Sequence, residues 1–162
     1  MHWLIAWLVS FAPVCWAPPV HGPVVEPYRP PACTYCAGHR GLTFAPVPGA
    51  EVTAVDGGVV RFAGQVAGIR WVVVRHADGR LASYGRLVVV SVVVGQNVSA
   101  GQALGLAGAR LYFGLRADGL PLDPTPLLGR WRSPPRLVPT DGSPRRPGPT
   151  PRLTCAAGGS GR

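Results

Sequence analysis

The chain has 162 residues and a formal net charge of +9 at pH 7; 47% of its residues are hydrophobic and 14% are charged. This length allows one compact domain beside a targeting segment. All 16 basic residues are Arg, since the sequence contains no Lys. The composition therefore excludes functions that need a lysine, such as P-loop phosphate binding, Schiff-base catalysis and carriage of biotin or lipoyl groups.

The N-terminal segment 1–17 is predicted to be a signal peptide. It is an apolar run of the usual length that ends in small residues at Ala17, although His2 stands where a Lys or Arg is common. It is short for a membrane-spanning helix. We therefore expect cleavage near Ala17 and a secreted chain with oxidised cysteines; an uncleaved anchor and a buried N-terminal strand are the alternatives.

Segment 18–37 is a Pro-rich lead-in that contains a C-x-x-C motif. Val24 and Val25 are predicted to form a short strand that ends before Pro27. From residue 43 to residue 128, short Val-rich runs alternate with Gly- and Asp-containing turns. This pattern predicts an all-β fold, a compact antiparallel sheet or barrel without long helices.

The run Leu87–Val94 is almost continuously apolar. Such a run predicts a strand that is buried on both faces or covered by a neighbouring loop.

Segment 129–162 is rich in Arg, Pro, Gly and Ser and is predicted to be a disordered or loosely docked basic tail. Its charge would attract polyanions such as anionic wall polymers, lipid headgroups or nucleic acid; the alternative is a solubilising extension. Nucleic acid is the least favoured partner, because residues 133–162 contain no aromatic side chain for base stacking.

The segments GHRGLTF, YGRL and RLYF, in this order, resemble those of the lysostaphin/LytM-type peptidoglycan endopeptidases. The resemblance extends over about residues 24–128, with the peptidase-like domain expected at 38–128. It implies a small antiparallel β core and export from the cytoplasm. It also implies a zinc site whose bound water cleaves the peptide cross-bridges of the cell wall.

The resemblance places the first metal ligand at His39, in the position of the family's H-x-x-x-D pair. Thr43 replaces the Asp of that pair, and a neutral hydroxyl is a poor zinc ligand. In the Y-x-H-L segment, Tyr84 fits the pattern while Arg86 replaces the His. Arg110 replaces the first His of the late H-x-H pair.

Tyr112 occupies the second position of that H-x-H pair, so one of the three expected metal ligands is retained. Arg86 and Arg110 cannot accept a proton and would repel a dication. The resemblance therefore predicts a cleft lined by Tyr84, Arg86, Arg110 and Tyr112 that suits a carboxylate or phosphate. Ordinary packing of an idle site is the alternative.

One other set of side chains could bind a metal. Cys33, Cys36 and His39 have types and spacing compatible with zinc, but in an exported chain a disulfide is preferred, either between Cys33 and Cys36 or from one of them to Cys155. A thiol oxidoreductase motif is weakly indicated, because no helical pattern follows. His76 is predicted to be structural.

These observations predict a non-catalytic, secreted or cell-wall-associated domain. It would bind peptidoglycan or another anionic wall polymer, or regulate a wall hydrolase, and no cofactor is expected. The alternative is an active zinc metalloendopeptidase with an atypical ligand set.

Overall fold

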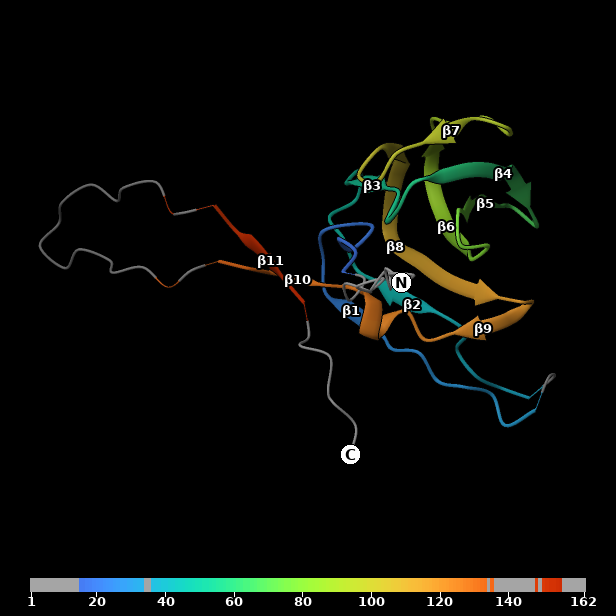
Figure 1. Ribbon diagram of the computed structural model, residues 1–162, viewed down its shortest axis with the longest axis horizontal. Helices are drawn as coiled ribbons and strands as arrows, with labels where there is room; N and C mark the ends of the chain where they lie inside the picture. Colours follow the sequence, from blue (N-terminus) through green and yellow to red (C-terminus); the bar gives the residue numbers. More distant parts are fainter. Residues whose placement is uncertain (1–14, 34–35, 134, 136–147, 149, 156–162) are drawn as a thin grey trace, which may run out of the picture.

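The computed structural model describes residues 15–33, 36–133, 135, 148 and 150–155. These residues form antiparallel strands and one short 3-10 helix, Thr125–Leu127 (Figure 1). The all-β prediction is therefore confirmed. None of the helices in this part of the chain is long and apolar enough to cross a membrane.

Nine strands form one sheet, in the order β1-β2-β8-β6-β5-β4-β7, with β3 and β9 also paired to β8. Figure 1 shows β8 running through the middle of this sheet, between β2 and β6. The bounds of the nine strands are β1 Val24–Glu26, β2 Leu42–Phe44, β3 Glu51–Thr53, β4 Gly58–Val66, β5 Ile69–His76, β6 Leu81–Val90, β7 Asn97–Val98, β8 Ala103–Ala117 and β9 Leu120–Leu122.

Strands β6 and β8 are longer than the sequence predicted, because each joins two apolar runs that glycines separate. In β6 the junction is a bulge at which Arg86 has φ 67°, a conformation that side chains other than Gly rarely adopt. The neighbouring Gly85 is required by packing, since a Cβ there would overlap the ring of Trp71. The sheet therefore continues through this bulge, and the Trp71 ring packs directly against the backbone of Gly85.

The core lies on one side of these strands and is made by alternate residues. Val72 and Val74 of β5, Tyr84 of β6, and Phe113 and Leu115 of β8 are completely buried. The Tyr84 and Phe113 rings pack with their centroids 5.3 Å apart. This packing fixes the register of β6 and β8, on which the candidate site depends.

The prediction for Leu87–Val94 is wrong. Strand β6 ends at Val90, and although Leu87 is buried, Val88 is 48% exposed and Val93 68% exposed. Two features explain this exposure. Val93 lies in the segment after the strand has ended, and the register shifts on either side of Leu87 leave Val88 and Val89 both exposed instead of alternating.

The N-terminal part of the described chain belongs to the fold. Trp16 is buried; its N–H donates to the Leu127 carbonyl at 2.8 Å and its carbonyl accepts from the N–H of Gly129 at 2.8 Å. A disulfide joins Cys15 to Cys155. A signal peptide ending at Ala17 would remove Cys15 and Trp16 from this arrangement; residues 1–14 of the predicted leader lie outside the described residues.

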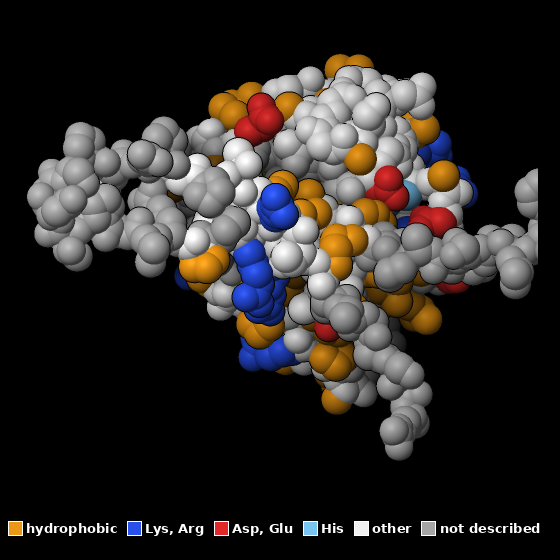
Figure 2. Space-filling view, turned by 60° about the vertical axis from the view of Figure 1, so that its left-hand side comes forward, with side chains coloured by type: hydrophobic (Ala, Val, Ile, Leu, Met, Phe, Trp, Pro, Cys, Tyr) orange, Lys and Arg blue, Asp and Glu red, His pale blue; other side chains and the backbone are white. Residues whose placement is uncertain are grey.

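The C-terminal segment, predicted to be a disordered or loosely docked tail, contains two strands in its described part, while residues 134, 136–147, 149 and 156–162 of this segment lie outside the described residues. Its strands β10 (Arg130–Arg132) and β11 (Arg152–Thr154) form a separate antiparallel pair. Figure 1 shows this ribbon extending from the sheet beside β1. In Figure 2, where this side comes forward, arginine side chains gather next to hydrophobic ones.

Candidate functional site

The candidate site is a row of residues across five strands. Glu26 of β1 pairs with Thr43 of β2, Thr43 with Tyr112 of β8, Tyr112 with Gly85 of β6, and Gly85 with Trp71 of β5. Residues directly opposite in an antiparallel sheet share a face, so the side chains of this row stand on one side of it. The row brings together two of the positions that the family resemblance assigned to metal ligands, Thr43 and Tyr112.

His39, the retained ligand position, lies just before β2 and is oriented toward this row. Its Nδ1 lies 3.0 Å from the Pro27 carbonyl oxygen, and its Nε2 lies 3.1 Å from Thr43 Oγ1. Because a carbonyl only accepts, Nδ1 carries the hydrogen and donates it, and this bond fixes the imidazole with Nε2 toward the site. The edge of the Tyr112 ring also meets the His39 ring, at a centroid distance of 5.7 Å.

Glu26 is a member of the site that the sequence reasoning missed. Its carboxylate lies 3.8 Å from His39 Nε2 and 3.7 Å from a guanidinium nitrogen of Arg110. Its pKa is lowered, chiefly by a hydrogen bond from the Thr43 hydroxyl and further by the charges of His39, Arg110 and Arg86. One signal was available, since Glu26 is the only acidic residue of segment 18–37 and lies in the predicted first strand.

The hydroxyl of Thr43 has two partners and one hydrogen. When His39 Nε2 carries no hydrogen, the hydroxyl donates to it; when Nε2 is protonated, it donates to the hydroxyl, which then donates to Glu26. Thr43 is 1% exposed, so its hydroxyl is screened from water, whereas the Glu26 side chain is 42% exposed. Thr43 thus links the imidazole to the carboxylate where the resemblance expected a ligand Asp.

Tyr112 and Arg86 occupy the positions of two family histidines. The Tyr112 hydroxyl donates to the Arg40 carbonyl at 3.0 Å, and burial raises its pKa. Its ring lies over Gly41 and Gly114, where a Cβ would approach it closely. Arg86 is exposed at the β6 bulge and contributes to the lowered pKa of Glu26. Of the two arginines of the predicted cleft, Arg110 lies 3.7 Å from this carboxylate, and Arg86 acts on it through its charge alone.

Tyr84 does not line the cleft, in contrast to the prediction. Its side chain is completely buried on the core side, and its hydroxyl accepts a hydrogen bond from the N–H of Val55 at 3.0 Å. The reason is again strand alternation, because the Y-G-R-L segment passes through the bulge after Tyr84 and Arg86 alone turns outward. Burial raises the pKa of Tyr84.

The cysteines are paired as disulfides. Cys33 is bonded to Cys36, one of the two arrangements that the sequence left open, and Cys155 is bonded to Cys15, a pairing that the sequence did not predict. Disulfide sulfurs do not act as thiolate ligands. His76 is 3% exposed and its Nδ1 donates to the Gly57 carbonyl at 2.9 Å, a placement in the interior rather than in the cleft.

The residues present do not fit a zinc ion. In the part of the chain that the structure describes, no three His, Cys, Asp or Glu side chains are grouped so as to hold a metal. Thr43 and Tyr112 supply neutral hydroxyls, and the Tyr112 hydroxyl is engaged by the Arg40 carbonyl. Arg110 adds a permanent positive charge. The arrangement instead suits hydrogen bonding and anions.

A coiled antiparallel sheet that carries this row, with a histidine and two arginines above it, defines a domain of the lysostaphin/LytM type. The model of Peptidase family M23 matches residues 37–124, more than half of the chain. The chain belongs to this family.

Three known proteins illustrate the relationship. The murein hydrolase activator EnvC of Escherichia coli is 35% identical over 99 residues, which are 56% of this chain and 24% of EnvC. The lipoprotein NlpD/LppB homolog of Pseudomonas aeruginosa is 30% identical over 131 residues, which are 70% of this chain and 43% of that protein. The chain thus spans less than half of these relatives.

The third is a solved structure, the catalytic domain of lysostaphin from Staphylococcus simulans. It is 24% identical, with a TM-score of 0.56, over 65% of this chain and 90% of that domain. At this identity the likeness concerns the fold alone, and it agrees with the fold that the sequence resemblance implied.

Proposed function

We propose that this chain is a non-catalytic M23 domain that acts outside the cytoplasm, binds anionic groups of peptidoglycan and regulates a wall hydrolase. The main support for the proposal is that the positions expected to bind zinc lie close together but mostly carry side chains that do not bind zinc. His39, Thr43 and Tyr112 remain neighbours, but the charged groups around them are Glu26 and Arg110.

The charge of the cleft favours an anionic ligand. Arg110 contacts Glu26 at 3.7 Å, which is a loose ion pair, and its side chain is 54% exposed. Such a pair contributes little stability, so its partners are available to exchange. A ligand carboxylate that takes the place of Glu26 on Arg110 would form the shorter, two-pronged contact that a guanidinium prefers.

The relatives support the regulatory part of the proposal. EnvC is described as a murein hydrolase activator and the Pseudomonas protein as a lipoprotein. A regulator of wall hydrolysis needs a surface that binds the wall or the hydrolase, and it needs no metal of its own. The cleft described above meets this requirement.

The test is sedimentation of the purified chain with isolated peptidoglycan sacculi, together with dye release from labelled sacculi. We expect binding without dye release, with or without added zinc. Arg110→Ala should weaken binding several-fold, because it removes an exposed positive charge of the cleft. Arg61→Ala is the matched control, since Arg61 is an exposed arginine of β4 outside the cleft.

A second arm adds the chain to a separately purified peptidoglycan hydrolase and measures dye release. If the chain changes the rate of dye release by the hydrolase, and this effect is lost in Arg110→Ala but kept in Arg61→Ala, the result supports regulation of the hydrolase. Unchanged sacculus binding in Arg110→Ala contradicts the role of the cleft. Dye release by the chain alone that a chelator stops would replace this proposal with the alternative of an active zinc endopeptidase.

A further inference from the structure

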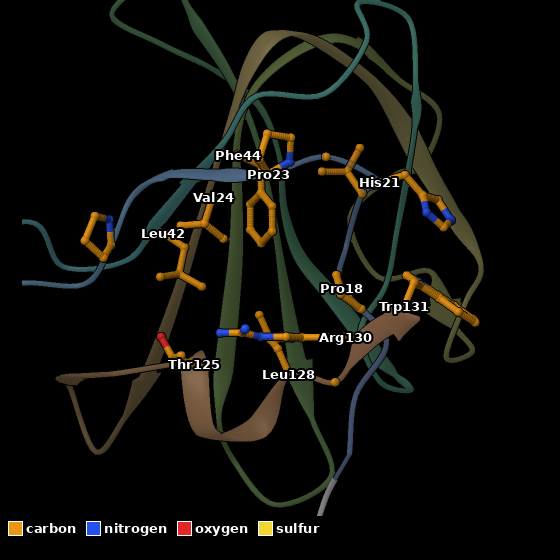
Figure 3. Close-up of a pocket in the computed structure, with 14 residues that line it drawn as sticks. Pro18, His21, Pro23, Val24, Leu42, Phe44, Thr125, Leu128, Arg130 and Trp131 are labelled. Atoms are coloured by element: carbon orange, nitrogen blue, oxygen red, sulfur yellow. The ribbon is translucent and has the colours of Figure 1, made fainter. Parts of the chain in front are cut away.

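A second hollow lies on the other side of β2 from the cleft. Leu42 and Phe44 flank Thr43 along the strand, so their side chains point to the opposite face. They form one wall of a pocket of about 660 Å³ whose other walls are the lead-in segment 18–27 and segment 125–131 (Figure 3). It shares no lining residue with the cleft.

Most of the residues that line the pocket are apolar, with His21 on one side and Arg130 and Thr125 on the other. Proline, valine, leucine and aromatic side chains make up most of its lining, and no acidic residue is among the lining residues. The ionisable ones are His21 and Arg130. Figure 3 shows the Arg130 side chain reaching from β10 beneath the Phe44 ring toward Thr125.

Within the described part of the chain, Arg130 has no acidic partner. The ion pairs found there join Glu26 to His39 and Arg110, and Asp78 to Arg80. A guanidinium always carries its charge, and the exposed Arg130 presents this charge at the pocket. An anionic group in the pocket would therefore be attracted to Arg130. Apolar walls with one cationic end match a ligand that has an apolar body and an anionic head.

The dimensions favour a small molecule over an extended peptide. Pockets for small ligands have volumes of about 300–1,000 Å³ and are mostly apolar with a few polar groups. A peptide strand would have to pair with the free edge of β1, but β1 has three residues and lies between Pro23 and Pro27. Proline has no N–H and fixes its φ, so this edge is too short for strand addition.

The walls of the pocket are held in place before any ligand arrives. The two hydrogen bonds of the Trp16 backbone tie the lead-in to Leu127 and Gly129, and the Cys15–Cys155 disulfide lies beside them. Trp131 stacks on His21 with ring centroids 5.6 Å apart. Binding therefore needs little reorganisation, which lowers its entropic cost.

We propose that this pocket binds a single-chain anionic amphiphile, with the alkyl chain against Leu42 and Phe44 and the carboxylate or phosphate head at Arg130. This site is independent of the cleft and of the function proposed for it.

The test is calorimetric titration of the full chain with four decyl compounds below their micelle concentrations: decanoate, decyl phosphate, 1-decanol and decyltrimethylammonium. We expect saturable binding of the two anions, with their relative affinity identifying the preferred head. Arg130→Gln should weaken anion binding roughly tenfold, the size of one charge-assisted hydrogen bond, and leave 1-decanol unaffected.

Arg132→Gln is the matched control, because it removes the same charge from β10 at a position that does not line the pocket. Val24→Trp should abolish binding of every decyl compound by filling the pocket, since Val24 lines it and is 46% exposed. Circular dichroism establishes that each variant is folded.

Several results would overturn the proposal. The first is that neither anion binds, and the second is that Arg130→Gln and Arg132→Gln lose the same amount of anion affinity. The others are that decyltrimethylammonium binds as tightly as decanoate, or that folded Val24→Trp binds the decyl compounds as the native chain does. A peptide C-terminus that binds more tightly than decanoate with the same dependence on Arg130 would assign the pocket to a protein partner instead. Arg110→Ala should leave decanoate binding unchanged, so this proposal and that for the cleft fail separately.

Discussion

Thr43 and Tyr112 lie directly opposite each other on β2 and β8, and the ring of His39 is adjacent to both. Three positions that the family resemblance assigned to zinc ligands are thus neighbours in space, although only one of them, His39, retains a side chain that binds zinc. The scaffold of the site has been kept while its chemistry has changed.

The double substitution T43D/Y112H should restore zinc binding. It supplies a carboxylate and a second imidazole beside His39, giving three ligands of the types that catalytic zinc sites use. Elemental analysis of protein purified without chelator should find stoichiometric zinc in the double variant and little in the parent chain. T43D and Y112H alone are the controls, each with two ligands. A folded double variant without zinc would show that these positions do not correspond to the ligands.

Glu26 should titrate below the usual range of a glutamate. The Thr43 hydroxyl is the largest cause of its lowered pKa, followed by the neighbouring positive charges. Thr43→Val should therefore raise the pKa of Glu26 toward the ordinary value, as measured by NMR titration of the side-chain carboxyl. The native protein is the reference, and an unchanged pKa in Thr43→Val would contradict the assigned hydrogen bond.

The same shift has a consequence for stability. Because the pKa of Glu26 is lower in the folded state, its contribution is present above the unfolded value of about 4.3 and is lost as the pH falls through the folded pKa. The free energy of unfolding of Glu26→Gln should therefore depend less on pH in this acidic window than that of the native chain. Urea unfolding at a series of pH values measures the difference. Parallel curves for the two proteins would exclude a linked role for Glu26.

Tyr84→Phe should destabilise the domain without affecting the cleft. The substitution leaves the buried N–H of Val55 without its acceptor, a loss of about 1–3 kcal/mol. Urea unfolding measures it. Tyr28→Phe is the control, because the Tyr28 hydroxyl bonds the Pro121 carbonyl in a partly exposed place and its removal should cost less. Weaker binding of sacculi by folded Tyr84→Phe would contradict the assignment of Tyr84 to the core and indicate that it takes part in the cleft.

The fold was predictable because the signals that define it are local. Val-rich runs between Gly- and Asp-containing turns predict strands, and the motif order predicts the family. The continuity of β6 and β8 was not predictable, because Arg86 and its glycine neighbours interrupt the pattern that a strand normally shows. The exposure of Val88 likewise depends on which face of the sheet is covered, and that of Val93 on where β6 ends; both are tertiary properties.

The candidate site was predictable where the family motifs mark it. His39, Thr43, Arg110 and Tyr112 are together as the resemblance implied. Glu26 was not found, because it comes from a three-residue strand whose pairing with β2 has no local signature. Tyr84 was misplaced because motif spacing does not reveal on which side of a bulge a side chain points.

We predict that any N-terminal processing of the chain occurs before Cys15. Trp16 is 5% exposed, its indole N–H donates to Asp56 at 3.2 Å, and the guanidinium of Arg80 lies 5.0 Å from its ring centroid. Removal of so large a buried side chain costs about 3–5 kcal/mol, so Trp16→Ala should lower the free energy of unfolding by this amount. Trp16→Phe should be milder because it keeps most of the packing. Intact-mass analysis of the exported chain locates its first residue, and a mature chain that begins at Pro18 with full stability would contradict the structural role of Trp16.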